Sequence, residues 1–197
     1  MNQQTFIFLG PQGSGKGTHA KELESDLKRF DPSRDVVHFE MGKNLRDIAA
    51  QESYTGKLLQ EIISRGELVP FNISSSVLSS YLMQHMKGNE HLIIDGFPRS
   101  DSQMEVLDST MAFYKRENPT VVHINISDEE GLKRLLLRGR ADDTEENIRK
   151  RLAWTRAEWE RILSRFNQNP IYRILEIDGD HTIDEVHADI LAQLKLV

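Results

Sequence analysis

Short apolar runs rich in β-branched residues recur along the chain and predict the strands of a buried sheet. They occupy residues 5–9, 36–39, 91–95, 121–126 and 174–177. Each run is nearly continuous in apolar character, which is typical of strands buried on both faces of a parallel sheet. Helical patterns lie between them, as in residues 15–30 and 182–196. This alternation indicates an α/β layered fold with right-handed crossovers.

Two segments depart from this alternation. Residues 41–86 contain about three helical stretches before the next strand, which predicts a small helical insertion. Residues 128–167 form a long, charged helical region that is broken at Gly139. We find no internal repeat and no Pro/Gly-rich linker, so the 197 residues are expected to form a single domain.

Composition excludes several classes of function. The chain has no cysteine, which excludes a disulfide framework, a thiolate zinc site and a cysteine nucleophile. The histidines show no metal-ligand spacing, and the formal net charge of −6 argues against a nucleic-acid polymer as partner. The N-terminus lacks the features of a signal peptide, and no apolar run approaches the roughly 20 residues of a membrane span. We therefore expect a cytoplasmic protein without a membrane partner.

The first apolar run leads directly into a glycine-rich segment, GPQGSGKGT at residues 10–18. It matches G-x-x-x-x-G-K, with Gly-Thr following the lysine. Glycines let backbone N–H groups surround a phosphate, and the next helix directs its positive N-terminus at the same anion. Lys16 adds a mobile charge for the β- and γ-phosphates. A strand before the segment and a helix after it make a phosphate site the better interpretation than an ordinary turn.

A second turn follows the strand at residues 91–95. It reads Asp95-Gly96-Phe97-Pro98-Arg99. An acidic residue at the end of a buried apolar strand has the position of a Walker-B carboxylate, which orients Mg²⁺ or its waters. Taken alone, Asp95 could equally cap the N–H groups of a helix-entry turn.

Arginines gather around the break at Gly139: Arg134, Arg138, Arg140 and Arg151. Arg149 and Lys150 each follow a glutamate by four residues and therefore have helical partners. Arg151 has none at that spacing, and Arg134 and Arg138 form a like-charge pair that costs a few tenths of a kcal/mol. Arginines without ion-pair partners suggest that a polyphosphate binds between them. The alternative is that they form a solvated, charged helix face. Asp143 and Glu146 have the spacing of a capping box.

GPQGSGKGT, DGFPRS and GRADDTEENIRKRL, in this order, resemble the motifs of the adenylate kinase family of nucleoside monophosphate kinases. The resemblance covers nearly the whole chain. It implies a P-loop NTPase-type three-layer α/β fold with a five-stranded parallel sheet. The implied division is a core at 1–40, 70–137 and 144–197, an NMP-binding helical arm at about 41–69 and a minimal lid at about 138–143. A lid this short has no room for zinc.

The resemblance also implies a donor site and an acceptor site. The ATP-binding set comprises Gly13, Ser14, Gly15, Lys16, Gly17, Thr18, Arg134, Arg138 and Gly179. The AMP-binding set comprises Met41, Arg46, Val69, Gly96, Arg99, Gln103, Arg140 and Arg151. Within them, Gln103 reads the adenine of AMP and Arg134 lies over the base of ATP. The implied catalytic residues are Lys16, Arg99, Arg140 and Arg151.

These roles imply an enzyme that reversibly transfers the terminal phosphate of ATP to AMP, giving two ADP. Mg²⁺ accompanies ATP, with Asp95 acting through water, and no zinc is expected. Met41 stands where the family's adenylate members usually have threonine, so a UMP/CMP kinase or a kinase of broad acceptor range stays open. A nucleotide-binding module without turnover is a further alternative. A monomer is expected because it is usual in this family.

Overall fold

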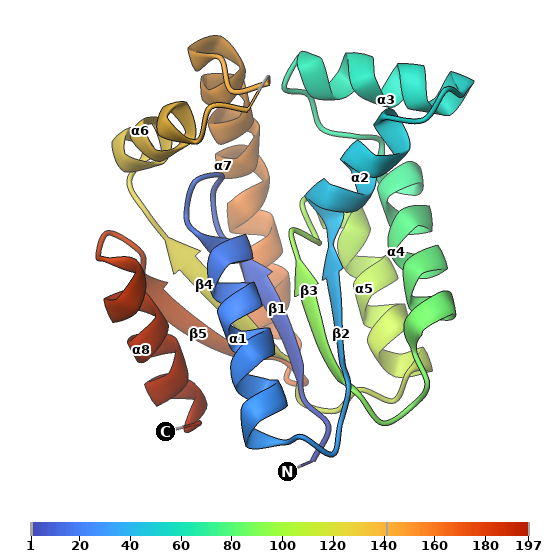
Figure 1. Ribbon diagram of the computed structural model, residues 1–197, viewed down its shortest axis with the longest axis vertical. Helices are drawn as coiled ribbons and strands as arrows, with labels where there is room; N and C mark the ends of the chain where they lie inside the picture. Colours follow the sequence, from blue (N-terminus) through green and yellow to red (C-terminus); the bar gives the residue numbers. More distant parts are fainter. Residues whose placement is uncertain (1, 141, 197) are drawn as a thin grey trace.

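A five-stranded parallel sheet forms the centre of the molecule (Figure 1). The computed structural model describes residues 2–140 and 142–196. The strands are β1 (Thr5–Leu9), β2 (Val36–Glu40), β3 (His91–Asp95), β4 (Thr120–Asn125) and β5 (Arg173–Asp178). Their order across the sheet is β2-β3-β1-β4-β5. The strands and the α/β fold class predicted from the apolar runs are confirmed, with strand ends that agree to within one residue.

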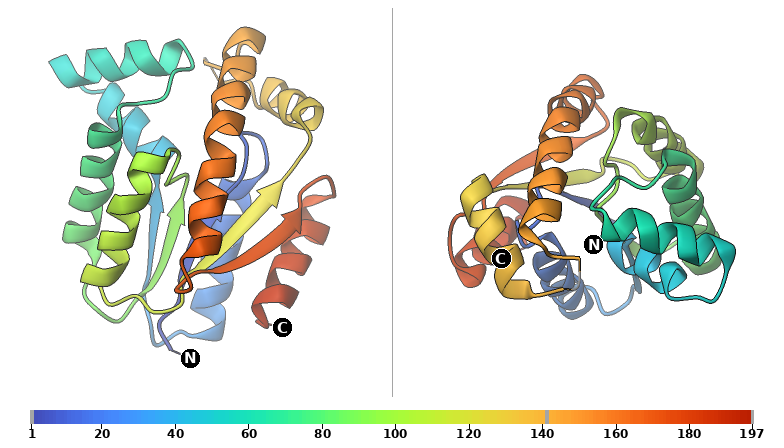
Figure 2. Two further views of the ribbon diagram at one scale, coloured as in Figure 1. Left: turned by 180° about the vertical axis from the view of Figure 1, so that it is seen from behind. Right: turned by 90° about the horizontal axis from the view of Figure 1, so that it is seen from above.

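Helices cover both faces of the sheet and give it three layers. They are α1 (Lys16–Phe30), α2 (Met41–Ala49), α3 (Tyr54–Ser64), α4 (Phe71–His85), α5 (Asp101–Phe113), α6 (Asp128–Arg138), α7 (Glu145–Gln168) and α8 (Ile183–Leu194). Helices α1 and α8 pack on one face, while α4, α5 and α7 pack on the other (Figure 2). The described helices include none that is long and apolar enough to cross a bilayer.

Successive side chains of β1 pack alternately on the two faces of the sheet and so hold both helical layers. Phe6 and Phe8 pack against α1 and α8, whereas Ile7 and Leu9 pack against the opposite layer. All four are buried, and burying each such side chain contributes about 1.5–3 kcal/mol. The prediction that every strand is buried on both faces is wrong for β2 and β5. Exposure alternates along these two strands because they form the edges of the sheet.

The charged helical region is divided in two, and the break at Gly139 is confirmed. Gly139 ends α6 with φ of 65°, a left-handed conformation that favours glycine. The capping box predicted for Asp143 and Glu146 is wrong. Thr144 is the N-cap of α7, and its hydroxyl accepts a hydrogen bond from the backbone N–H of Asn147. Asp143 is instead bound by arginine side chains.

The segment after α3 touches α7 across the carboxyl end of the sheet. The Asn147 side-chain amide donates to the carbonyl of Ser64 at 2.7 Å, and Trp154 Nε1 donates to the carbonyl of Gly66 at 3.1 Å. Gly66 has φ of +67°, and a Cβ there would lie 2.9 Å from the Asn147 carbonyl oxygen. Glycine at this position therefore allows the two segments to meet.

Candidate functional site

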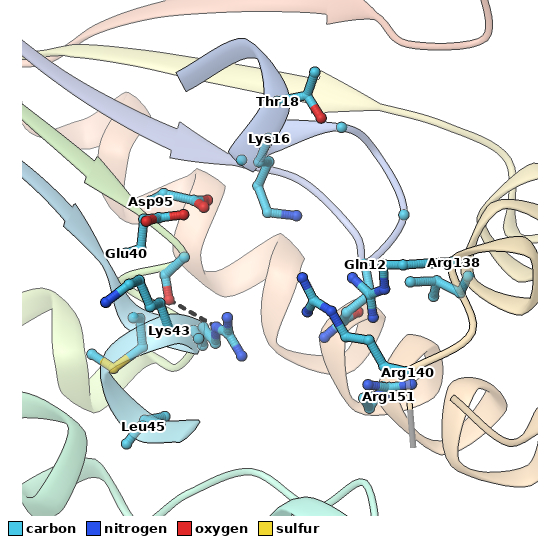
Figure 3. Close-up of a pocket in the computed structure, with 18 of the residues that line it drawn as sticks. Gln12, Lys16, Thr18, Glu40, Lys43, Leu45, Asp95, Arg138, Arg140 and Arg151 are labelled. Carbon is cyan, nitrogen blue, oxygen red and sulfur yellow. Dashed lines mark hydrogen bonds between the residues drawn. The ribbon is translucent and has the colours of Figure 1, made fainter. Parts of the chain in front are cut away.

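A cleft of about 690 Å³ lies at the carboxyl end of the sheet. The loop between β1 and α1 forms its floor, α2 and the segment after α3 form one wall, and α6 and α7 form the other. Open α/β sheets bind ligands at the carboxyl ends of their strands. Figure 3 shows Asp95 and Glu40 on one side of the cleft and Arg138, Arg140 and Arg151 on the other, with Lys16 between them.

The loop before α1 is shaped as a phosphate cradle. Gly15 adopts φ of 85° at the N-cap of α1, so the free N–H groups of the first turn face the cleft. Gly13 has φ of +87°, and a Cβ there would lie 2.8 Å from the Gly131 carbonyl oxygen. The ammonium of Lys16 donates to the carbonyls of Gly10 at 2.8 Å and Pro11 at 2.7 Å. The loop therefore holds the lysine beside the space that an anion would occupy.

The pH dependence of donor binding follows from Lys16. Burial lowers the pKa of its ammonium to about 8, against the opposing attraction of Asp95. The charged form is lost as the pH rises through this value, so the cleft attracts polyphosphate less strongly above it. We expect the affinity of the cleft for a polyphosphate to fall by up to about tenfold per pH unit on the alkaline side. Binding of inorganic triphosphate near the pKa should take up a proton, measured by calorimetry in two buffers of different ionisation enthalpy. Binding heats that do not depend on the buffer would contradict this.

Two carboxylates face the loop from neighbouring strands. Glu40 ends β2 and Asp95 ends β3, and the two residues are in register. Burial raises the pKa of Asp95, while Lys16 and Arg99 oppose this rise. This carboxylate pair and Thr18 line the same cleft and offer the oxygen ligands that Mg²⁺ prefers. Glu40 was not predicted as a site residue, although its position at the carboxyl end of a strand was the available signal.

Arg99 lies in the turn between β3 and α5, and a hydrogen bond within this turn holds its side chain. Its Nε donates to the carbonyl of Gly96 at 2.7 Å, and Gly96 adopts φ of +77°. A Cβ on Gly96 would lie 2.7 Å from Arg99 Nη2, so glycine leaves room for the guanidinium. The Gln103 side chain accepts from the Arg99 backbone N–H at 2.5 Å and donates to Ser74 Oγ at 2.8 Å.

The predicted site residues are brought together almost completely. All of the implied acceptor residues line the cleft, including Met41, Arg46 and Val69 on the α2–α3 side. The implied donor residues also line it, except two. Ser14 is buried beneath the loop, where its hydroxyl accepts from Lys16 at 3.3 Å. Gly179 does not line the cleft, and its backbone carbonyl accepts a hydrogen bond from Arg134 Nη2 at 2.9 Å.

The prediction that Arg134, Arg138 and Arg151 lack partners is wrong. Arg134 pairs with Glu130 at 2.7 Å, four residues before it on α6. Arg138 binds Asp143 through two hydrogen bonds of 2.9 Å each. Arg151 donates to Asp142 at 2.8 Å and to Asp143 at 2.6 Å. The last two arginines find partners in the loop before α7, which helical spacing does not reveal.

A different set of cations has no acidic partner. Within residues 2–140 and 142–196, no carboxylate lies within ion-pair distance of Lys16, Arg46, Arg99 or Arg140, and all four line the cleft. Burial lowers the pKa of Arg99 and of Arg140, and neighbouring arginines lower both further. Because Lys and Arg side chains outnumber the carboxylates that line the cleft, and these four lack ion-pair partners, the cleft is positive in an acidic protein.

Asp143 is the acceptor on which the α6–α7 loop depends. Burial alone would raise the pKa of Asp143, but hydrogen bonds from Arg138 and Arg151 hold it below its ordinary value. Asp143→Ala should lower the free energy of unfolding by about 2–3 kcal/mol, less than for a fully buried pair because Arg138 is partly exposed. Urea unfolding measures this loss. The loss should vanish as the pH falls through the folded pKa of Asp143, because the carboxylate is then protonated.

Asp128→Ala is the matched control for this variant. Asp128 pairs with Arg156 on the surface, where both side chains are well exposed. Its removal should cost about 0–1 kcal/mol. Equal losses in the two variants would show that Asp143 does not organise the loop.

The cleft has what the transfer of a phosphoryl group between two anions requires, because positive groups enter it from both walls and a helix N-terminus fixes one phosphate position. The fold and the cleft together define a P-loop phosphotransferase. The family model described as adenylate kinase matches residues 8–171. The chain therefore belongs to the adenylate kinase family.

Curated relatives agree over nearly the full length. The adenylate kinase of Thermus thermophilus is 34% identical over 197 residues, covering 98% of each chain. That of Campylobacter hominis is 35% identical over 189 residues, covering 95% of this chain and 93% of the relative. That of Synechococcus sp. (strain RCC307) is 32% identical over 189 residues, covering 96% and 97%. The chain is thus similar to enzymes whose acceptor is a phosphate group.

Proposed function

We propose that the protein catalyses the reversible reaction of ATP with AMP to give two ADP. The observation that carries this proposal is the set of four cleft cations without acidic partners among the described residues, Lys16, Arg46, Arg99 and Arg140. Lys16 extends from the start of α1, Arg46 from α2, Arg99 from the turn between β3 and α5, and Arg140 from the segment between α6 and α7. Two highly charged nucleotides that meet end to end would supply the missing negative charge.

The chemistry needs no general base. A phosphate oxygen of AMP is already anionic, and it attacks the γ-phosphorus of ATP as the bond to the β-phosphate oxygen breaks. Most of the barrier comes from aligning the two nucleotides and stabilising charge on the transferring group. Lys16 and Arg140 stabilise that group, while Arg99 and Arg46 hold the acceptor phosphate.

Mg²⁺ fits the carboxylate side of the cleft. Thr18, Glu40 and Asp95 would hold the ion directly or through its waters, because they line the cleft beside the donor loop. When bound, the ion neutralises negative charge on the donor phosphates. Removal of Mg²⁺ by a chelator should therefore abolish turnover.

We further propose that residues 41–69 act as a mobile arm and residues 138–143 as a minimal lid. Closure of both would exclude water and so prevent hydrolysis of ATP. The contacts of Asn147 with Ser64 and of Trp154 with Gly66 support this proposal, since they join the two walls of the cleft. A cytoplasmic monomer stays a prediction, which cell fractionation and sedimentation analysis would test.

Adenine is the acceptor base that the Gln103 amide fits. The Arg99 backbone N–H must bond to an oxygen, so it fixes Oε1 of Gln103 on its side and leaves Nε2 toward Ser74. One further acceptor site on Oε1 and one further N–H on Nε2 stay available to a base. The adenine edge needs this pair, because its amino group donates and its ring nitrogen accepts. The guanine edge has the reverse arrangement.

Gln103→Met is therefore expected to lower kcat/KM for AMP by about 10–100-fold, the effect of one lost buried hydrogen-bonding group. Steady-state kinetics with AMP and GMP measures it, and discrimination against GMP should weaken in parallel. Gln84→Met, at an exposed position of α4, is the control and should change neither value. An unchanged preference for AMP in Gln103→Met would contradict the assignment of base reading to this residue.

The proposal as a whole is tested by a coupled assay with ATP, Mg²⁺ and each of AMP, CMP, UMP, GMP and dTMP. AMP should give the highest kcat/KM. A clear preference for CMP or UMP would favour the pyrimidine kinase alternative, which Met41 left open. Stoichiometric ATP binding without ADP formation from any monophosphate would favour a nucleotide-binding module without turnover.

A further inference from the structure

A second group of metal-ligand side chains lies where α1 packs against α8. His19 and Glu22 are three residues apart on α1 and therefore share one face of that helix. His187 faces them from α8, and one ligand atom from each of the three residues lies within 4.8 Å of the others. Among the described residues this is the only group of at least three such side chains gathered closely enough to hold an ion.

Both histidines approach the same carboxylate oxygen, Oε2 of Glu22. Nδ1 of His19 and Nδ1 of His187 each lie 3.2 Å from Oε2 of Glu22. Ligands of a tetrahedral ion with bonds of about 2.0–2.2 Å lie about 3.3–3.6 Å apart, so the two measured separations are close to those of a metal site. The histidine side chains are 3% and 15% exposed and that of Glu22 is 36% exposed, which leaves a path for an ion from solvent.

Asp26 determines which nitrogen of His187 carries the proton. Its Oδ2 lies 2.7 Å from Nε2 of His187, and a carboxylate can only accept, so the proton of the neutral ring sits on Nε2. Nδ1 of His187 then presents a lone pair to a carboxylate oxygen, and this buried atom has no hydrogen-bond partner. Two electron-rich atoms at 3.2 Å require a cation between them, either a proton or a metal ion.

We propose that His19, Glu22 and His187 form a binding site for one divalent transition-metal ion of the Zn²⁺, Co²⁺ or Ni²⁺ type. Two imidazoles and one carboxylate suit these ions, whereas Mg²⁺ prefers oxygen ligands alone. A carboxylate that fixes the outer nitrogen of a ligating histidine is the usual support of such sites, and Asp26 occupies that position. The fourth coordination position is available to water.

In the other histidine–carboxylate contacts of the described chain, two imidazoles do not meet at one carboxylate. The pairs are His38 with Glu24, His91 with Asp31, His123 with Glu176 and His181 with Asp178, each through a single imidazole. The absence of cysteine and the short lid, on which the expectation of no zinc rested, do not bear on a site built from histidines.

An ion at this place would join α8 to the first turns of α1. His19 follows Thr18 directly, and its ring lies close enough to Gly15 that a Cβ there would be 3.2 Å from His19 Nε2. The ion would therefore stabilise the helix that carries the phosphate loop. None of its three ligands is shared with the Mg²⁺ position, although His19 also lines the cleft. The ion needs no nucleotide, so its test does not depend on the proposed reaction.

The test is a titration of the full, tag-free and nucleotide-free protein with Co²⁺ in excess Mg²⁺, followed by visible absorption. We expect one equivalent to bind with the strong bands of a four-coordinate site, and Zn²⁺ to displace it. Glu22→Gln and His187→Gln should weaken binding at least about tenfold, and Asp26→Asn about 10–100-fold. His181→Asn, which removes an exposed histidine beside one carboxylate, should bind as the wild type does.

Several results would overturn the proposal. The wild type could show no saturable band, which would mean that a proton alone bridges the three side chains. Binding could also persist unchanged in Glu22→Gln and His187→Gln, which would place the ion elsewhere. Circular dichroism shows whether His187→Gln folds. If His187→Gln does not fold, the test rests on Glu22→Gln, which should fold because Glu22 is partly exposed on the surface of α1.

Discussion

Lys16→Met is expected to lower kcat by about 10²–10³-fold, the usual effect of removing one preorganised donor from a transition state. Methionine keeps the length of the side chain and loses its charge. In the structure the ammonium donates to the carbonyls of Gly10 and Pro11, so its position is fixed before a nucleotide binds. The charge that builds up on the transferring phosphoryl group would lose its nearest mobile cation. KM for AMP should change little, because AMP binds on the other wall.

Steady-state kinetics at saturating ATP and AMP measures the loss for Lys16→Met. Lys28→Met is the matched control, since Lys28 lies on the same helix and pairs with Glu24 on the surface. It should keep wild-type turnover. Near-wild-type kcat in Lys16→Met would remove the loop from the mechanism and with it the proposed donor site.

Arg140→Met is expected to lower kcat by about 10³-fold or more, the effect of losing an arginine that neutralises a transferring phosphoryl group. Arg140 has no acidic partner among the described residues, and burial together with Arg138 lowers its pKa. Its positive charge therefore does not stabilise the folded protein. We expect the melting temperature of Arg140→Met to equal that of the wild type or to exceed it, while activity falls.

This opposite behaviour of activity and stability separates a catalytic role from a structural one. Arg149→Met is the control, because Arg149 pairs with Glu145 on the exposed face of α7 and does not line the cleft. It should leave kcat unchanged. A fall in both melting temperature and activity in Arg140→Met would instead assign Arg140 to the packing of the α6–α7 loop.

The fold could be predicted because the sequence patterns that indicate its strands and helices lie within short segments of the chain. Continuous apolar runs indicated the strands, and the glycine-rich segment after β1 placed the start of α1 close to Lys16. The edge character of β2 and β5 was less accessible from the sequence. Whether one face of a strand is covered depends on the order of strands in the sheet, which is set by contacts between residues far apart in the chain.

Most of the residues that line the cleft were among those predicted from the sequence, but their ion pairs were not. Spacing along a helix could not show that Asp142 and Asp143 reach back to Arg151, because those aspartates lie in a loop. The pairing of Glu40 with Asp95 could be recognised only when β2 was placed beside β3. The approach of His187 to His19 likewise depends on how α8 packs against α1. In each case the missing information was a long-range contact.

The hydrogen bonds from Asn147 to Ser64 and from Trp154 to Gly66 have a consequence for the rate at which the enzyme can work. Asn147 itself does not line the cleft, so it can be altered without touching the reacting groups. With the arm and lid closing as proposed, these bonds would break to let ADP leave and form again in each turnover. Evolution could therefore adjust the speed of the catalytic cycle, for instance to a colder or warmer habitat, through position 147 while the arginines and the lysine stay as they are.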